Sequence, residues 1–271
     1  MINSVLLPCP QNENTLLIPL LFIIFFTFTA TNKAIKDIGM TSHSFPSTCR
    51  TSCGHHEIKF PIGIDPGCGT PQLSMSCTNS STLQMPLNSK LFLVNNIDYI
   101  TKSIILEDPL MSNCANLNSF SNGLDIDLTN TGLTFGRSNT ILLLNCLSLT
   151  QQMNFLNSQY DCHSVTCWTF MSACHTQELP ASCCQVTDPR NGIDLYPLQC
   201  MSYTSIYSPQ SPILNPPSWS YGIEMQWTLP LEIIDKCNNC EERKGVCGYE
   251  TVVEQGKFRC RCNSALGCKG M

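Results

Sequence analysis

Four cationic side chains lie close together in a segment bounded by cysteines, residues 49–68. They are Arg50, His55, His56 and Lys59. Guanidinium and ammonium groups bind carboxylates, and an imidazole gains positive charge as the pH falls through its usual pKa near 6.5. Disulfides in this segment would fix its backbone before a ligand arrives, which lowers the ordering cost of binding. The spacing therefore permits a small anion-binding surface, and we expect none of the four side chains in the core.

Cysteines supply a second possible chemistry near the C-terminus. Cys237 and Cys240, followed by Cys260 and Cys262, have the spacing of a zinc site, in which four thiolates surround the ion. The alternative is that these cysteines form disulfides. We favour disulfides and expect no metal, because the rest of the sequence indicates a secreted chain with an even number of cysteines.

The composition indicates an oxidising compartment. The chain has 271 residues and 19 cysteines, far more thiols than a reduced cytosolic protein uses. Charged residues make up 13%, against about 25% in ordinary soluble domains. The net charge of −5 argues against a nucleic-acid partner, which would require a clustered basic excess.

The N-terminus supports secretion. Residues 16–30 are apolar and uncharged, as in the core of a signal peptide, so we assign residues 1–30 to a signal. The alternative is an uncleaved anchor, because the uncharged stretch of residues 14–32 approaches the roughly 20 residues of a membrane span. Removal of Cys9 with the signal leaves an even eighteen cysteines, enough for nine bridges with no free thiol.

The remaining cysteines fall into two groups, separated by a Gln- and Asn-rich gap at residues 151–159. We therefore predict a linker at 31–48, a first module at 49–148 and a second at 160–271. Both groups hold an even number, so each module can close its own bridges, although the sequence does not choose the pairing. The first group is Cys49, Cys53, Cys68, Cys77, Cys114 and Cys146; the second is Cys162, Cys167, Cys174, Cys183, Cys184, Cys200, Cys237, Cys240, Cys247, Cys260, Cys262 and Cys268.

The elements that must position these groups are short strands. Apolar and polar residues alternate over residues 222–229 and 124–128, as in half-buried strands, and residues 91–100 are rich in apolar and β-branched types. Residues 208–218 hold four prolines and predict an extended loop. We expect a mainly β, small disulfide-rich fold of two modules, with little helix.

Catalytic patterns are absent from the sequence. It contains no GxSxG, HExxH, glycine-rich phosphate loop, HRD or DFG, and its five histidines have no recognisable nucleophile pattern around them. We therefore expect no enzymatic activity and no cofactor.

The first module contains three cysteine- and glycine-containing motifs in a fixed order along the chain. Residues 49–54 read CRTSCG, residues 60–64 read FPIGI and residues 68–77 read CGTPQLSMSC. This order resembles the galacturonan-binding extracellular module of plant wall-associated receptor kinases. Ile62 and Leu73 stand where that family often has Phe, and both replacements are apolar for apolar.

The second module resembles the companion cysteine-rich domain of the same receptors, so that the likeness covers about residues 49–268. Its six last cysteines resemble a degenerate EGF-like cap. The family's receptors continue into a membrane span and a kinase, and we expect membrane attachment only in a longer form or with an uncleaved N-terminus. The motifs, in the family's order, are SCC (182–184), GIEMQW (222–227), CNNC (237–240), GVCGY (245–249) and FRCRC (258–262).

The ligand that the resemblance implies is pectin or an oligogalacturonide, a polyanion of the cell wall. The four cations would then bind carboxylates, and Phe60 and Tyr99 would offer faces to sugar rings. The alternative places both aromatic rings in the core and leaves the cations scattered. Residues 31–235 carry a net charge of −7 and residues 236–271 a net charge of +3, which makes the latter the second candidate region.

We accordingly expect a non-catalytic, extracellular, pectin-binding protein of the cell wall, either a soluble form or part of a longer receptor. The alternative is a secreted cysteine-rich protein that binds a protein partner and not polysaccharide. Asn79 begins an Asn-Ser-Ser glycosylation sequon, and in a secreted chain we expect it to be glycosylated. The oligomeric state is left open.

Overall fold

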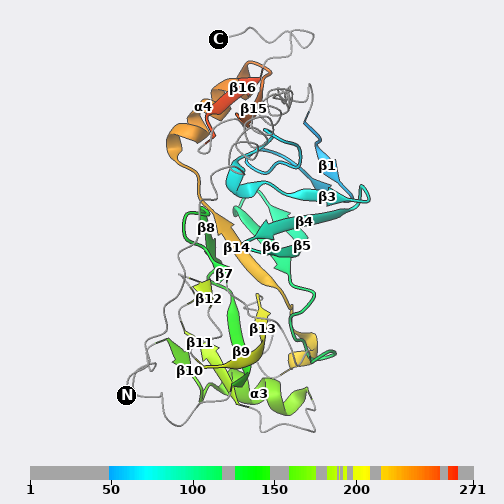
Figure 1. Cartoon of the computed structure of the whole chain (residues 1–271), viewed down its shortest axis with the longest axis vertical. Helices are drawn as coiled ribbons and strands as arrows, with labels where there is room; N and C mark the ends of the chain where they lie inside the picture. The colour runs from blue at the N-terminus through cyan, green and yellow to red at the C-terminus, as the bar shows by residue number, and fades with distance from the viewer. Residues whose placement is uncertain are drawn as a thin grey trace, which may run out of the picture. The chain divides into compact units, whose positions relative to one another are not determined.

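The computed structural model describes residues 49–117, 126–146, 159–174, 182–187, 189, 192–193, 198–207, 215–250 and 256–261. All of them belong to one compact unit, residues 46–271 (Figure 1). The predicted signal, the linker, Cys262, Cys268 and most of the proline-rich loop lie outside the described residues.

Short strands dominate the described residues, which confirms the expected mainly β, disulfide-rich fold. The strands are β1 (Ser52–Cys53), β2 (His56–Glu57), β3 (Ser76–Thr78), β4 (Thr82–Leu87), β5 (Lys90–Asp98), β6 (Ser103–Glu107), β7 (Ile126–Asp127), β8 (Leu133–Phe135), β9 (Thr140–Cys146), β10 (Tyr160–Asp161), β11 (Cys183–Val186), β12 (Gly192–Ile193), β13 (Cys200–Ile206), β14 (Ile223–Trp227), β15 (Val246–Tyr249) and β16 (Phe258–Arg261). Two α-helices accompany them, α3 (Val165–Ala173) and α4 (Leu231–Glu242).

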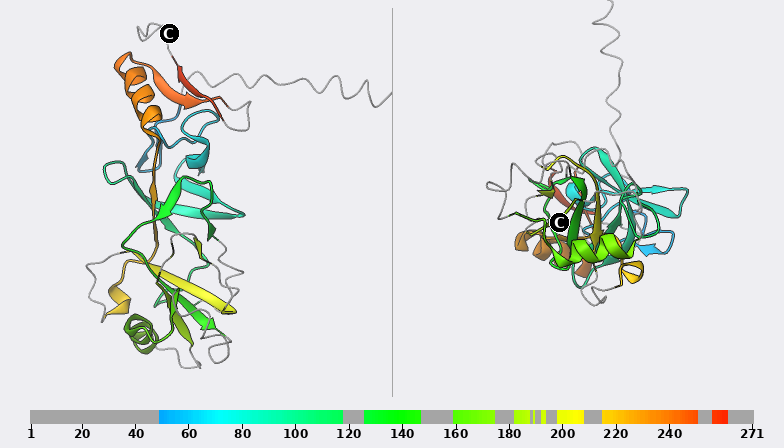
Figure 2. Two further views of the ribbon diagram at one scale, coloured as in Figure 1. Left: turned by 90° about the vertical axis from the view of Figure 1, so that its left-hand side faces the viewer. Right: turned by 90° about the horizontal axis from the view of Figure 1, so that it is seen from below.

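A six-stranded antiparallel sheet forms the centre of the unit, in the order β3-β4-β5-β6-β14-β8. In Figures 1 and 2 it lies between a four-stranded sheet and the β15–β16 hairpin. Strand β14 comes from the predicted second module, yet it pairs with β6 and β8. Its residues alternate as predicted, with Ile223, Met225 and Trp227 buried and the two between them half-buried.

The four-stranded sheet has the order β10-β11-β9-β13. Here β9 of the predicted first module lies between two strands of the second. Its four central residues, 141–144, are all buried, because each face of this strand meets a different part of the core. Ile141 and Leu143 join the large core, whereas Leu142 and Leu144 pack in the cluster with Phe170 of α3.

Eight disulfides connect sixteen of the eighteen predicted cysteines; a ninth would need Cys262 and Cys268, outside the described residues. Two bridges join the two cysteine groups, so the groups do not close their own bridges, although their even counts would have permitted it. The module boundaries stay a prediction, but the modules share both larger sheets. The pairs are Cys49–Cys68, Cys53–Cys77, Cys114–Cys174, Cys146–Cys200, Cys162–Cys184, Cys167–Cys183, Cys237–Cys247 and Cys240–Cys260.

We call residues 231–261, which comprise α4 and the β15–β16 hairpin, the cap. Cys237 and Cys240 are three residues apart on α4, so both side chains leave the helix toward the hairpin and pair with Cys247 and Cys260. The disulfide interpretation is confirmed for these four cysteines, which leaves them no thiolate for zinc. Within the described ranges, no helix combines the length and apolarity that a bilayer crossing requires.

Candidate functional site

Two glycines set the backbone of the first module by facing each other. A Cβ on Gly63 would lie 1.3 Å from the carbonyl oxygen of Cys68, and a Cβ on Gly69 would lie 2.4 Å from the amide nitrogen of Gly63. This close approach lets the Thr70 amide donate a 2.7 Å hydrogen bond to the carbonyl oxygen of Pro61. The glycines of the FPIGI and CG motifs are therefore required by backbone packing.

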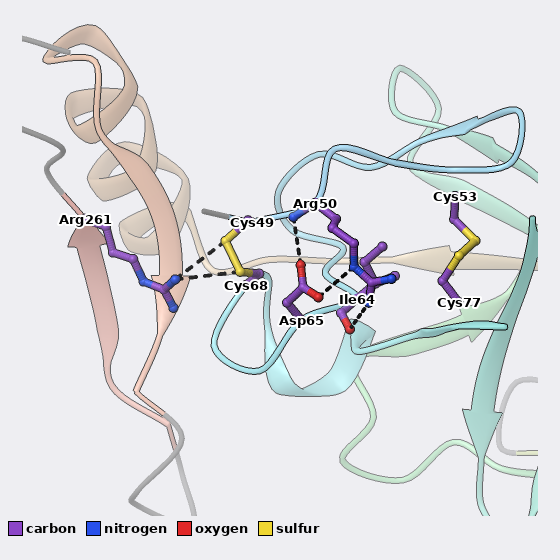
Figure 3. A network of polar contacts seen from close by, with 8 residues as sticks. All are labelled: Cys49, Arg50, Cys53, Ile64, Asp65, Cys68, Cys77 and Arg261. Atoms are coloured by element: carbon purple, nitrogen blue, oxygen red, sulfur yellow. Dashed lines mark hydrogen bonds and ion pairs between the residues drawn. A yellow bond between two sulfur atoms is a disulfide. The ribbon is translucent and has the colours of Figure 1, made fainter. Parts of the chain in front are cut away.

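Arg50 is held by an acidic partner next to the first disulfide. Its backbone N–H donates to Asp65 Oδ2 at 2.7 Å, and its Nε donates to Asp65 Oδ1 at 2.8 Å (Figure 3). The side chain of Arg50 is still 50% exposed. The Cys49–Cys68 bridge lies beside this pair. Arg50 can therefore meet a ligand from a fixed position, but Asp65 offsets much of its charge.

Lys59 and Tyr99 form a second polar group. The Lys59 amide donates to the Tyr99 hydroxyl at 2.9 Å, and that hydroxyl donates to the carbonyl oxygen of Glu57 at 3.0 Å. The Lys59 ammonium lies 6.0 Å from the centre of the Tyr99 ring and 2.9 Å from a carboxylate oxygen of Glu57. Burial raises the pKa of Tyr99, so the phenol remains a hydrogen-bond donor.

Phe60 lies in an aromatic cluster with the cap. Its ring stacks on Tyr249 with centroids 6.4 Å apart and meets Phe258 edge-on at 6.2 Å. The Tyr99 ring likewise meets the Trp227 ring edge-on, with centroids 6.0 Å apart. Both predicted stacking rings therefore pack against other aromatic side chains of the protein, and both are half-buried rather than in the core.

Four of the six candidates line one hollow of about 600 Å³, which we call the small cleft. Its first wall is built from Arg50, Lys59, Phe60 and Tyr99, and its far wall from the cap. The residue types alone did not single out the other polar groups in its walls, most of which come from distant segments of the chain. Besides Thr51, which follows Arg50, they are Lys102 from the β5–β6 turn and Asn238 and Glu241 from α4.

The two histidines do not line the small cleft. His55 is exposed, but His56 is only 7% exposed, so the expectation that no candidate cation lies in the core is wrong for His56. Burial, together with the neighbouring His55 ring at 3.9 Å, lowers the pKa of His56. Successive side chains of β2 point to opposite sides, which turns His56 inward. Burial favours the neutral form of its imidazole.

The low pKa of His56 predicts a loss of stability in acid. Because the folded protein resists protonation at this site, the unfolded state binds more protons as the pH falls below its ordinary pKa near 6.5. We expect the melting temperature to drop less between pH 7.5 and pH 5 in His56→Gln than in the parent. Exposed His55→Gln is the control and should follow the parent more closely. Equal drops in parent and His56→Gln would contradict the assignment.

Arg261 of β16 fixes the cap to the first module. Its Nη2 donates to the carbonyl oxygen of Gly67 at 2.7 Å, and its Nη1 lies 3.6 Å and 3.7 Å from the two sulfurs of Cys49–Cys68 (Figure 3). The Tyr249 amide donates to the same Gly67 carbonyl at 3.0 Å. Both walls of the small cleft are therefore held in one arrangement.

Comparison with known proteins supports the first-module motifs. Residues 49–108 match the family model described as wall-associated receptor kinase galacturonan-binding. The chain is 25% identical over 267 residues to wall-associated receptor kinase-like 20 of Arabidopsis thaliana, covering 93% of this chain and 39% of that protein. The chain is similar to the extracellular region of wall-associated receptor kinases. The expected resemblance is thus confirmed.

A second such relative, wall-associated receptor kinase-like 15 of the same plant, is 24% identical over 233 residues. That match covers 79% of this chain and 36% of the relative, so the chain spans well under half the length of either receptor. No solved structure matches the chain. Asn79 of the sequon lies exposed in the β3–β4 turn, and its glycosylation stays a prediction.

Proposed function

We propose that this chain is a non-catalytic extracellular protein that binds galacturonan, the polyanionic pectin of the plant cell wall. The observation that carries the proposal is the match of residues 49–108 to a galacturonan-binding family model. The likeness to receptor ectodomains and the eight disulfides both agree with an extracellular location. The chain would act as a soluble form or as part of a longer receptor.

The small cleft is compatible with a sugar acid. Arg50, Lys59 and Lys102 supply cations, and Tyr99 and Phe60 supply apolar surface beside them. The cations are partly offset, since Asp65 and Glu57 pair with the first two. We therefore expect a modest contribution from this cleft, on the order of 0.2–1 kcal/mol for each exposed cation.

Cosedimentation with de-esterified pectin tests the proposal. At low salt we expect the parent protein to pellet with this polymer and to remain in solution with fully methyl-esterified pectin, because esterification removes the carboxylate charges. The competing function is that of a cysteine-rich protein that binds a protein partner. Failure to pellet with de-esterified pectin at low salt would favour that second function.

A further inference from the structure

A larger hollow lies on the other side of α4 from the small cleft. It has a volume of about 1180 Å³, and we call it the basic groove. One wall comes from the first module at residues 70–73 and 130–132; the other is the cap, which the family model does not match. Figures 1 and 2 place α4 and the β15–β16 hairpin beside the blue and cyan segment that holds residues 70–73.

The two faces of α4 carry different chemistry. Ile233 and Lys236 lie three residues apart on α4 and face the basic groove, as does Arg243 directly after the end of the helix. Ile234 and Glu241 face the small cleft. The aromatic cluster of Phe60, Tyr249 and Phe258 separates the two hollows. Its last two members also line the basic groove and give it an apolar wall.

The basic groove is lined by four cationic side chains: Lys236, Arg243, Lys257 and Arg259. Among the residues that the structure describes, no aspartate or glutamate lines it. Lys236 pairs with Glu232, and Arg259 lies 2.8 Å from Glu250, both outside the lining. Arg243 and Lys257 are exposed, and no described carboxylate forms an ion pair with either.

The charge balance therefore distinguishes the two hollows. In the small cleft Arg50 and Lys59 have carboxylate partners and Glu241 adds a negative charge, so that among the described residues one cation there, Lys102, has no ion pair. The basic groove keeps two cations without such partners in the described structure, and its volume is about twice that of the small cleft. An anionic chain would gain more by entering the basic groove, because fewer fixed carboxylates oppose it.

We propose that the basic groove is a binding site for an anionic oligosaccharide, with Arg243 and Lys257 as its main carboxylate contacts. The proposal rests on the proposed function and extends it, since the cap would then supply the strongest part of galacturonan binding. The matched first module would form one wall and the small cleft a weaker second site. Because disulfides and Arg261 fix the cap, the groove needs little ordering when the ligand enters.

The test compares variants with equal loss of charge. In the basic-groove variant, Arg243→Gln is combined with Lys257→Gln; in the control, Arg137→Gln is combined with Lys244→Gln. All four side chains are exposed, and the control pair lines neither hollow. A third variant combines Arg50→Gln with Lys59→Gln in the small cleft. Binding of a de-esterified oligogalacturonide is measured by titration calorimetry at low salt, with melting temperature as the check on folding.

We expect the basic-groove variant to bind about three- to tenfold more weakly than the parent, the control pair less than twofold more weakly, and the small-cleft variant in between. If the parent binds and the basic-groove variant binds as tightly, this inference is overturned while the proposed function stands. An equal loss in the control pair would also overturn it, since net charge alone would then explain binding. A parent that does not bind at all would overturn the proposed function instead.

Discussion

Gly63→Ala is expected to prevent the first module from folding. A Cβ at this position would lie 1.3 Å from the carbonyl oxygen and 2.1 Å from the carbonyl carbon of Cys68, and both are backbone atoms. The chain can relieve this contact only by separating two segments joined through Cys49–Cys68 and through hydrogen bonds in which the carbonyl oxygens of Pro61 and Gly63 accept from the amides of Thr70 and Met75. Ordinary overpacking costs about 1–3 kcal/mol. We expect Gly63→Ala to cost more than that and to leave almost no folded protein.

Gly132→Ala is the matched control. Gly132 has φ +71°, and the nearest atom to an added Cβ is 3.8 Å away, so the substitution brings strain without a clash. We expect it to cost about 1–2 kcal/mol and to leave the protein folded. Secreted yield and melting temperature measure both variants. A Gly63→Ala protein that melts like the parent would show that these backbones do not approach so closely.

Removal of the Cys146–Cys200 bridge is expected to produce the second large effect. This bridge joins the end of β9 to the start of β13 and therefore joins the two cysteine groups, closing 54 residues of chain. Chain entropy assigns about 4 kcal/mol to a loop of that length. We expect the double alanine variant to be poorly secreted, with a melting temperature far below that of the parent.

The cap offers a comparison for this prediction. Cys237–Cys247 closes 10 residues, for which the same relation gives about 2.7 kcal/mol. Its double alanine variant should therefore lose less stability in thermal melts. If the two variants melt at the same temperature, the length of the closed loop does not set how much stability each disulfide contributes.

The sequence predicted strands where apolar residues alternate with polar ones or where apolar and β-branched residues gather. Ile223, Met225 and Trp227 alternate with polar residues, and β14 appears there. The apolar and β-branched residues of 91–100 likewise predicted a strand, and β5, Lys90–Asp98, covers most of that stretch. Helix α4 escaped prediction because Pro230, two asparagines and two cysteines obscure its period, and because the tertiary disulfides rather than helix propensity hold it.

The sequence did not predict which distant strands and cysteines pair with one another. An even number of cysteines in each group is compatible with closed modules, but the insertion of β9 between β11 and β13 brings Cys146 to Cys200. The candidate binding residues were predicted by type and spacing. Two of the cations and both aromatic residues, four of the six candidates, do meet in the small cleft. That His56 turns inward and that Asp65 pairs with Arg50 depend on local backbone geometry, which residue types do not encode.

The affinity of the parent protein for a de-esterified oligogalacturonide, measured by calorimetry at rising salt, tests the central claim most directly. If lysines and arginines bind sugar carboxylates, the affinity should be greatest at low salt and fall steadily as the ions screen those charges. The methyl-esterified oligomer should bind weakly throughout. Absence of binding at low salt, or equal affinity for the two oligomers, would contradict the account.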